Sequence, residues 1–249
     1  MATKKVEEII EIKPVVMRDV LVTIKGTSPL ITHAWSAKAK KQILEGELGW
    51  KNKTKVREPK DVLEEFVSSM YWLDRMPDEF TVDSVREALE GGARFGFPVT
   101  GIKQAAIKSV YRLGWAKDQV SLKTAFQVKP SVTAYYGGDC EIDFENKKIN
   151  IAPNTVKYAD LAEIKADPPV MREDPVTVGN GNADLRYRGE FRNWSIDFIL
   201  SYNVNGKYKL EDILNMINAG GCCNGIGEWR AEKDGVSGSF VVADAKALN

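Results

Sequence analysis

The residues best suited to chemistry lie near the end of the chain, in a glycine-rich segment. Residues 220–230 read GGCCNGIGEWR. Glycine has no Cβ and tolerates positive φ, so the backbone N–H groups of such a loop can closely approach phosphate oxygens or a flat base. Gly225 and Gly227 are therefore candidate nucleic-acid contacts, with Trp229 and Arg230 beside them. The alternative is that the glycines only cap the preceding helix and turn the chain.

A second candidate site combines arginines with aromatic side chains. Residues 186–194 read RYRGEFRNW, which places three arginines among three aromatic residues. Arginine contacts phosphates, and aromatic rings stack on the bases of a single strand. The candidate contacts here are Arg186, Tyr187, Arg188 and Arg192. A solvated structural face could have the same composition.

A third candidate is a basic helix. Residues 103–129 contain six basic residues and a single acid, Asp118. The apolar pattern of residues 100–115 predicts a helix that leaves Lys103, Lys108 and Arg112 partly exposed. These three side chains are candidates to neutralise phosphates, although a solvated structural face is the more common explanation of such a cluster when it is taken alone.

Catalysis and metal binding have few suitable residues. His33 is the only histidine, and no carboxylates cluster around it at ligand spacing, so neither a metal nor another cofactor is expected. The chain has no GxSxG elbow and no GxxxxGK[ST] loop. His33 could serve as a general base near a ribose hydroxyl. A lone histidine among apolar neighbours is more commonly packed or exposed without a role.

Composition limits the setting of the protein. Lys and Arg number 35 and so do Asp and Glu, so a polyanion must be held by a local patch rather than by a global field. The cysteines, Cys140, Cys222 and Cys223, have no CxxC spacing, which argues against a disulfide framework and a cysteine zinc site. The start of the sequence lacks the apolar core of a signal peptide, and no window is long and apolar enough for a membrane span. We expect a cytoplasmic protein without a membrane partner.

Hydrophobic periodicity predicts a mixture of helices and strands within a single domain over residues 1–249. Helices are expected at about 34–44, 61–70, 82–89, 100–115 and 210–219. Strands are expected at about 15–24, 125–128, 132–136, 141–144, 148–151, 168–178, 193–204 and 240–242. An N-terminal arm at 1–15 carries isoleucines that need another surface to cover them, and a basic insertion at about 46–60 is expected to extend from the core.

Two segments resemble one superfamily. Residues 97–108, FPVTGIKQAAIK, resemble the I-P-G-S-S-L-K-G-A-L-R entry to the first helix of the RAMP proteins, above all the backbone subunits of CRISPR effector complexes. The tail from residue 220 to 240 is similar to their C-terminal glycine-rich loop. Val99 and Gly101 replace the usual glycine and serine, and Gln104 replaces the second glycine. These departures leave room for a viral or plasmid relative.

The resemblance implies a fold and roles for particular residues. The fold would be α+β, a modified ferredoxin-like (RRM-like) antiparallel sheet with helices on one face and an inserted hairpin or thumb. Lys103 would match the lysine that faces the guide RNA backbone, and the loop around Gly225 and Gly227 would face the RNA.

The resulting hypothesis is a non-catalytic protein that binds single-stranded RNA or DNA, with RNA favoured, and oligomerises along the strand. A phage protein that binds or anneals single-stranded DNA is a variant of this hypothesis. One alternative is a metal-independent RNA endonuclease, with His33 as general base and Lys103 or Arg186 stabilising the cleaving phosphate. Another is a self-assembling viral structural protein that does not bind nucleic acid.

Overall fold

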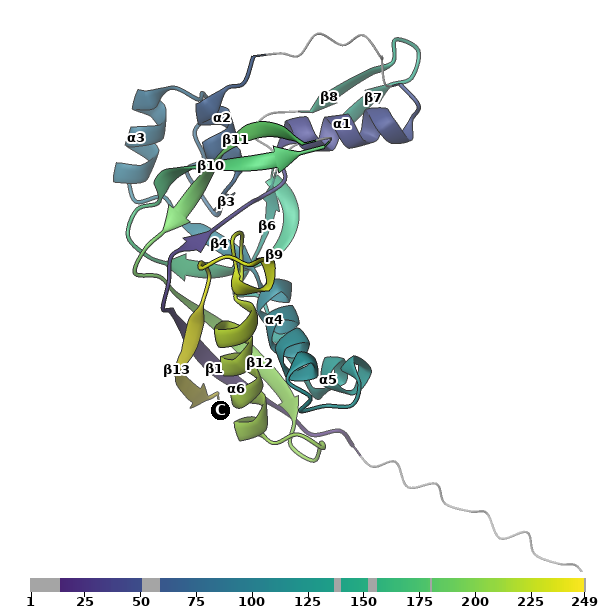
Figure 1. Cartoon of the computed structure of the whole chain (residues 1–249), viewed down its shortest axis with the longest axis vertical. Helices are drawn as coiled ribbons and strands as arrows, with labels where there is room; N and C mark the ends of the chain where they lie inside the picture. The colour runs from purple at the N-terminus through teal and green to yellow at the C-terminus, as the bar shows by residue number, and fades with distance from the viewer. Residues whose placement is uncertain (1–13, 51–58, 137–139, 152–155, 180, 249) are drawn as a thin grey trace, which may run out of the picture.

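A computed structural model describes residues 14–50, 59–136, 140–151, 156–179 and 181–248. These residues form a mixed α+β structure built on one large antiparallel sheet (Figure 1). None of the helices in the described ranges is long and apolar enough to cross a membrane.

Two strands that are far apart in the sequence form the centre of this sheet. β1 (Met17–Gly26) pairs antiparallel with β12 (Ser195–Asn203) along its whole length except its last residue. Val22 lies opposite Phe198, and both side chains are buried on the same face. Alternate residues point to opposite faces of a strand, so this register directs the apolar residues of both strands into one core.

The sheet extends on both sides of this pair. β13 (Phe240–Ala247) pairs with β1, and β5 (Phe126–Lys129) pairs with the second half of β12, so the order is β13-β1-β12-β5 with every pairing antiparallel. The first residues of β12 pair with β9. β9 (Val156–Lys165) in turn pairs with β4 (Phe95–Pro98) and with β6 (Val132–Tyr136), and β4 pairs with β3 (Tyr71–Trp72).

Two helices cover the apolar face of the sheet. α4 (Val99–Arg112) and α6 (Leu210–Ala219) pack against each other in front of β1 and β12 (Figure 1). Their inward residues, such as Ile102 on α4 and Ile213 on α6, are fully buried. α5 (Gln119–Ala125) follows α4, and the π-helical turn η1 (Gly220–Asn224) and the 3-10 turn η2 (Ala231–Lys233) follow α6.

The helices α1 to α3 and the strands β2, β7, β8, β10 and β11 form a second group of elements at the opposite end of the molecule from α5 (Figure 1). A three-stranded sheet has the order β10-β11-β2. α2 packs against β11, and α1 lies beside β8 of the β7–β8 hairpin. The bounds are α1 (Ala37–Glu47), α2 (Val62–Ser68), α3 (Val82–Glu90), β2 (Leu30–Ile31), β7 (Cys140–Asp143), β8 (Lys148–Ile151), β10 (Val170–Val178) and β11 (Asn182–Phe191).

Most of the expected elements are present. The structure confirms each expected helix to within a few residues, and side-chain caps by Asp61 and Thr81 begin α2 and α3 as their residue types predict. It adds α5, β2, β3, β4, β9 and β11, which the sequence analysis did not identify. Residues 1–13 of the arm and 51–58 of the basic insertion lie outside the described residues.

Candidate nucleic-acid interface

The glycine-rich segment after α6 lies in close contact with the backbone of other elements. A Cβ built on Gly227, whose φ is +77°, would meet the carbonyl oxygen of Ile31 at 2.3 Å, and the next residue, Glu228, donates its N–H to that oxygen at 2.9 Å. A Cβ built on Gly225, whose φ is +70°, would lie just over 3 Å from Arg230 and from two backbone oxygens. Both glycines are therefore required by packing within the protein. The segment is held as a fixed support for the side chains that follow it.

One of these side chains, Glu232 on η2, gathers three basic residues. Lys108 Nζ donates to Glu232 Oε1 at 2.9 Å, and Arg112 Nη2 donates to the same oxygen at 3.1 Å. Arg230 donates to Oε2 through Nε at 3.0 Å and through Nη2 at 2.9 Å. The buried Asn224 accepts a hydrogen bond from Arg112 Nη1 at 3.4 Å and donates to Oε2 at the same distance. We call these five residues the Glu232 cluster.

The Glu232 carboxylate stays charged because of its neighbours. Burial, which leaves its side chain only 7% exposed, raises its pKa. Hydrogen bonds from Lys108 and Arg230, and the positive charges of both residues, outweigh this effect and lower the pKa to about 2. Three cations around one carboxylate leave the cluster with a net positive charge. Its outer part is accessible, since the Arg112 side chain is 57% exposed.

Two exposed aromatic residues follow the cluster's α4 residues closely in the sequence. Tyr111 follows Lys108 by three positions on α4, and Trp115 follows Arg112 by three, just beyond the end of the helix. Trp115 is 60% exposed and Tyr111 is also exposed. The sequence analysis missed both as site residues, although they are aromatic residues within the basic stretch 103–129. Cations and exposed rings in one segment are suited to a single strand, whose phosphates and bases are both available.

Lys103 lies apart from this cluster. Its Nζ donates to the carbonyl of Lys123 on α5 at 2.8 Å and sits 5.5 Å from the centre of the Phe126 ring. Burial lowers the pKa of Lys103. The structure therefore brings Lys108, Arg112 and Arg230 together but directs Lys103 toward α5.

The arginines of the 186–194 segment form ion pairs with acidic residues. β11 holds Arg186 at 3.4 Å from Glu65 of α2, and the buried Arg188 is 3.5 Å from Asp174 of β10. Arg192, just after β11, lies 2.8 Å from Glu190. The first two pairs join β11 to α2 and β10, which accounts for Arg186 and Arg188 by packing, whereas Arg192 pairs within its own segment and its side chain is 62% exposed.

The aromatic candidates also contact the protein itself. The Tyr187 ring lies 5.6 Å from the ammonium group of Lys60. Trp229 has a positive φ of 50°, and its buried indole N–H has no hydrogen-bond partner within the described part of the chain. Neither ring lies within the Glu232 cluster.

His33 pairs with a residue of the glycine-rich segment. Its Nδ1 lies 3.5 Å from Oε1 of Glu228, and both side chains are partly exposed. The hydrogen bond with His33 lowers the pKa of Glu228, against the effect of burial. Burial and the Glu228 charge raise the pKa of Tyr71 to about 12. A carboxylate that orients a histidine is one element of general acid–base sites.

Metal ligands are not grouped in the described ranges, where no three His, Cys, Asp or Glu side chains lie close enough together to hold an ion. Cys140, Cys222 and Cys223 are free thiols.

No known family model matches this chain, and no curated protein matches its sequence.

Replacing Glu232 with Gln should destabilise the protein in a pH-dependent way. The folded-state pKa of about 2 lies below the ordinary value of 4.5, so the carboxylate contributes stability above pH 4.5 and loses it as the pH falls toward 2. We expect Glu232→Gln to cost on the order of 3 kcal/mol at pH 7 and much less near pH 2.5. Denaturant unfolding at a series of pH values measures both quantities.

The matched control is Glu87→Gln, which removes an exposed carboxylate from α3. This variant should unfold like the wild type at every pH. A Glu232→Gln penalty that does not change with pH would contradict the assignment of a charged carboxylate.

Proposed function

We propose that this chain binds single-stranded nucleic acid, with RNA favoured, through the phosphate backbone, and that copies line up along the strand without catalysis. The observation that carries the proposal is the Glu232 cluster, in which Lys108, Arg112 and Arg230 converge on one carboxylate. Glu232 fixes the three cations in position and compensates only one of their three positive charges. A phosphate that approaches the exposed side of Arg112 meets donors that are already ordered, which reduces the entropy cost of binding.

A modified ferredoxin-like core is part of this proposal. The support is the strand order β13-β1-β12-β5, together with the chain order β1, α4, β5, β12, α6, β13 and helices on one face of the sheet. The chain inserts β2 to β4 with α1 to α3 between β1 and α4, and β6 to β11 between β5 and β12, while α5 follows α4 and the turns η1 and η2 follow α6. The second insertion contains the long β10–β11 hairpin, which is our candidate for a thumb. A RAMP relationship would fit this arrangement, since the resembling segments contribute α4 and the glycine-rich loop.

The opposite face of the sheet is less suited to nucleic acid. Outward positions of β1 and β12 carry Asp19, Thr23 and Asp197, none of them aromatic. Asp19 pairs with Lys129 at 2.6 Å, and Asp197 pairs with Lys165 at 2.7 Å. A sheet that binds RNA on its open face typically presents aromatic rings there. These ion pairs favour the helical side, where the Glu232 cluster lies.

Neutralising two exposed cations of the cluster should weaken binding. We expect Lys108→Gln combined with Arg112→Gln to lower the affinity for single-stranded RNA and DNA. The slope of log K against log salt should become less steep by about 1.4, since each phosphate contact with a single strand contributes about 0.7. Fluorescence anisotropy with nuclease-treated protein over a salt series measures both.

Lys25→Gln is the matched control, because Lys25 is an exposed lysine on β1. It should leave the salt slope unchanged. Absence of binding by the wild type to either strand at low salt would sink the proposal and favour the alternative of a structural protein.

Trp115 should contribute by stacking on a base. We expect Trp115→Leu to weaken binding by roughly 5- to 150-fold, since stacking of one base on an aromatic ring contributes about 1–3 kcal/mol. Trp115→Phe should retain most of the affinity because it keeps an aromatic face. Equal losses in Leu and Phe variants, or the same loss with an abasic strand, would show that stacking is not the cause.

A second candidate function is the metal-independent RNA endonuclease, which the His33–Glu228 pair favours. If the chain only binds, labelled RNA incubated with the protein and a chelator should remain intact on a denaturing gel. Cleavage that persists in chelator and disappears in His33→Ala would instead support the endonuclease.

A further inference from the structure

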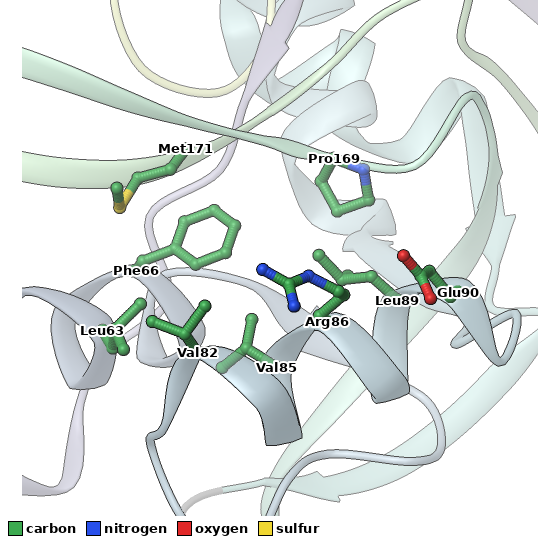
Figure 2. A pocket seen from close by; sticks show the side chains of 9 residues that line it. All are labelled: Leu63, Phe66, Val82, Val85, Arg86, Leu89, Glu90, Pro169 and Met171. Carbon is green, nitrogen blue, oxygen red and sulfur yellow. The ribbon is translucent and has the colours of Figure 1, made fainter.

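An apolar groove lies at the end of the molecule that holds the inserted elements. It runs between α2 and α3, and the start of β10 forms its other wall (Figure 2). Phe66, Val85 and Leu89 lie along it, and Met171 and Val82 lie at its edge. Its volume is about 330 Å³. Val82 is 57% exposed and Met171 is 48% exposed, so apolar surface remains open to water there.

The N-terminal arm contains apolar residues that would be more stable if an apolar surface covered them. Residues 6–12 read VEEIIEI, in which four apolar side chains alternate irregularly with three glutamates. Transfer of such side chains from water to an apolar groove is favourable. The guanidinium of Arg86 lines the same groove together with Glu90. Arg86 bonds Asp83 through Nη1 at 3.3 Å, and its other nitrogens can pair with one of the glutamates of the arm.

The arm cannot reach the groove of its own molecule. It joins the chain at the start of β1, where Val16 accepts a backbone hydrogen bond from Val204 just beyond β12. A fully extended chain would hold Ile9 within about 25 Å of Val16. β1 itself spans roughly 30 Å.

The groove lies further away than the far end of β1. From that end the chain continues into β2, which pairs with β11, and β11 pairs with β10, where Met171 lies. Figure 1 shows the start of β1 and the α2–α3 region at opposite ends of the molecule. The isoleucines of the arm can therefore enter this groove only in another copy.

We propose that residues 6–12 of one copy dock in the α2–α3 groove of a second copy. The contact joins different surfaces of the two partners, so it leaves one arm and one groove free and can be repeated. The biological role of this contact rests on the proposed function, because the contact would line up copies of the protein along a strand. The contact itself forms without nucleic acid.

Complementation between two variants tests the docking. The groove variant, Val82→Glu with Met171→Glu, keeps its arm, and the arm variant, with Ile9, Ile10 and Ile12 each changed to Ser, keeps its groove. Sedimentation velocity on nuclease-treated full-length protein should show wild-type oligomers that grow with concentration. Each variant alone should be monomeric, and an equal mixture of the two should form dimers and nothing larger.

Val120→Glu with Val236→Glu is the control, since both valines are exposed elsewhere on the surface. This variant should assemble like the wild type. A monomeric wild type, variants that still assemble, or a mixture that remains monomeric would overturn the proposal. The Lys108→Gln, Arg112→Gln protein should assemble normally, so loss of nucleic-acid binding and loss of docking are separate results.

Discussion

The candidate site depends on the close packing of the glycine-rich segment, whose backbone lies directly against the backbone of the elements on either side of it. A Cβ on Gly220 would meet the backbone of Ala106 on α4 at 2.7 Å, and one on Gly221 would meet the carbonyl oxygen of Phe240 at 2.0 Å. Gly227 is limited in the same way by Ile31. The segment therefore fills a space that only backbone fits, between α4, β13 and β2. This close approach brings Glu232, with Arg230 bonded to it, within hydrogen-bonding distance of Lys108 and Arg112 on α4.

Electrostatics then determines what this contact can do. A buried carboxylate is stable only when it is paired, and Glu232 is paired with Lys108, Arg112 and Arg230 from two separate parts of the chain. The same bonds that stabilise Glu232 hold long, flexible side chains in one arrangement. Elsewhere the arginines of β11 are each matched by an acid, so their charge is used within the protein. The Glu232 cluster therefore differs from the β11 region in having more cations than carboxylates.

Local patterns in the sequence predicted most of the fold. Helices with clear apolar periodicity and a capping residue, such as α3 after Thr81, could be read directly. β11 could not, because its run of arginines and aromatics does not alternate between apolar and polar residues, and its structure comes from pairing with β10. Likewise, residues 103–129 appeared strongly basic because the counter-charge for Lys108 comes from Glu232, more than a hundred residues later. Charge partners at such separation are set by the tertiary fold and leave no local signal.

The positive excess at the Glu232 cluster has a consequence for the molecule as a whole. Basic and acidic residues are equal in number, with a formal net charge of zero, so a surplus of cations in one place requires a surplus of acids elsewhere. The protein is therefore an electric dipole without a net charge. A distant polyanion exerts almost no net pull on such a molecule but does exert a torque, which turns the cluster toward the polyanion before contact. Salt would suppress this alignment at separations beyond about a Debye length, roughly 8 Å at physiological ionic strength.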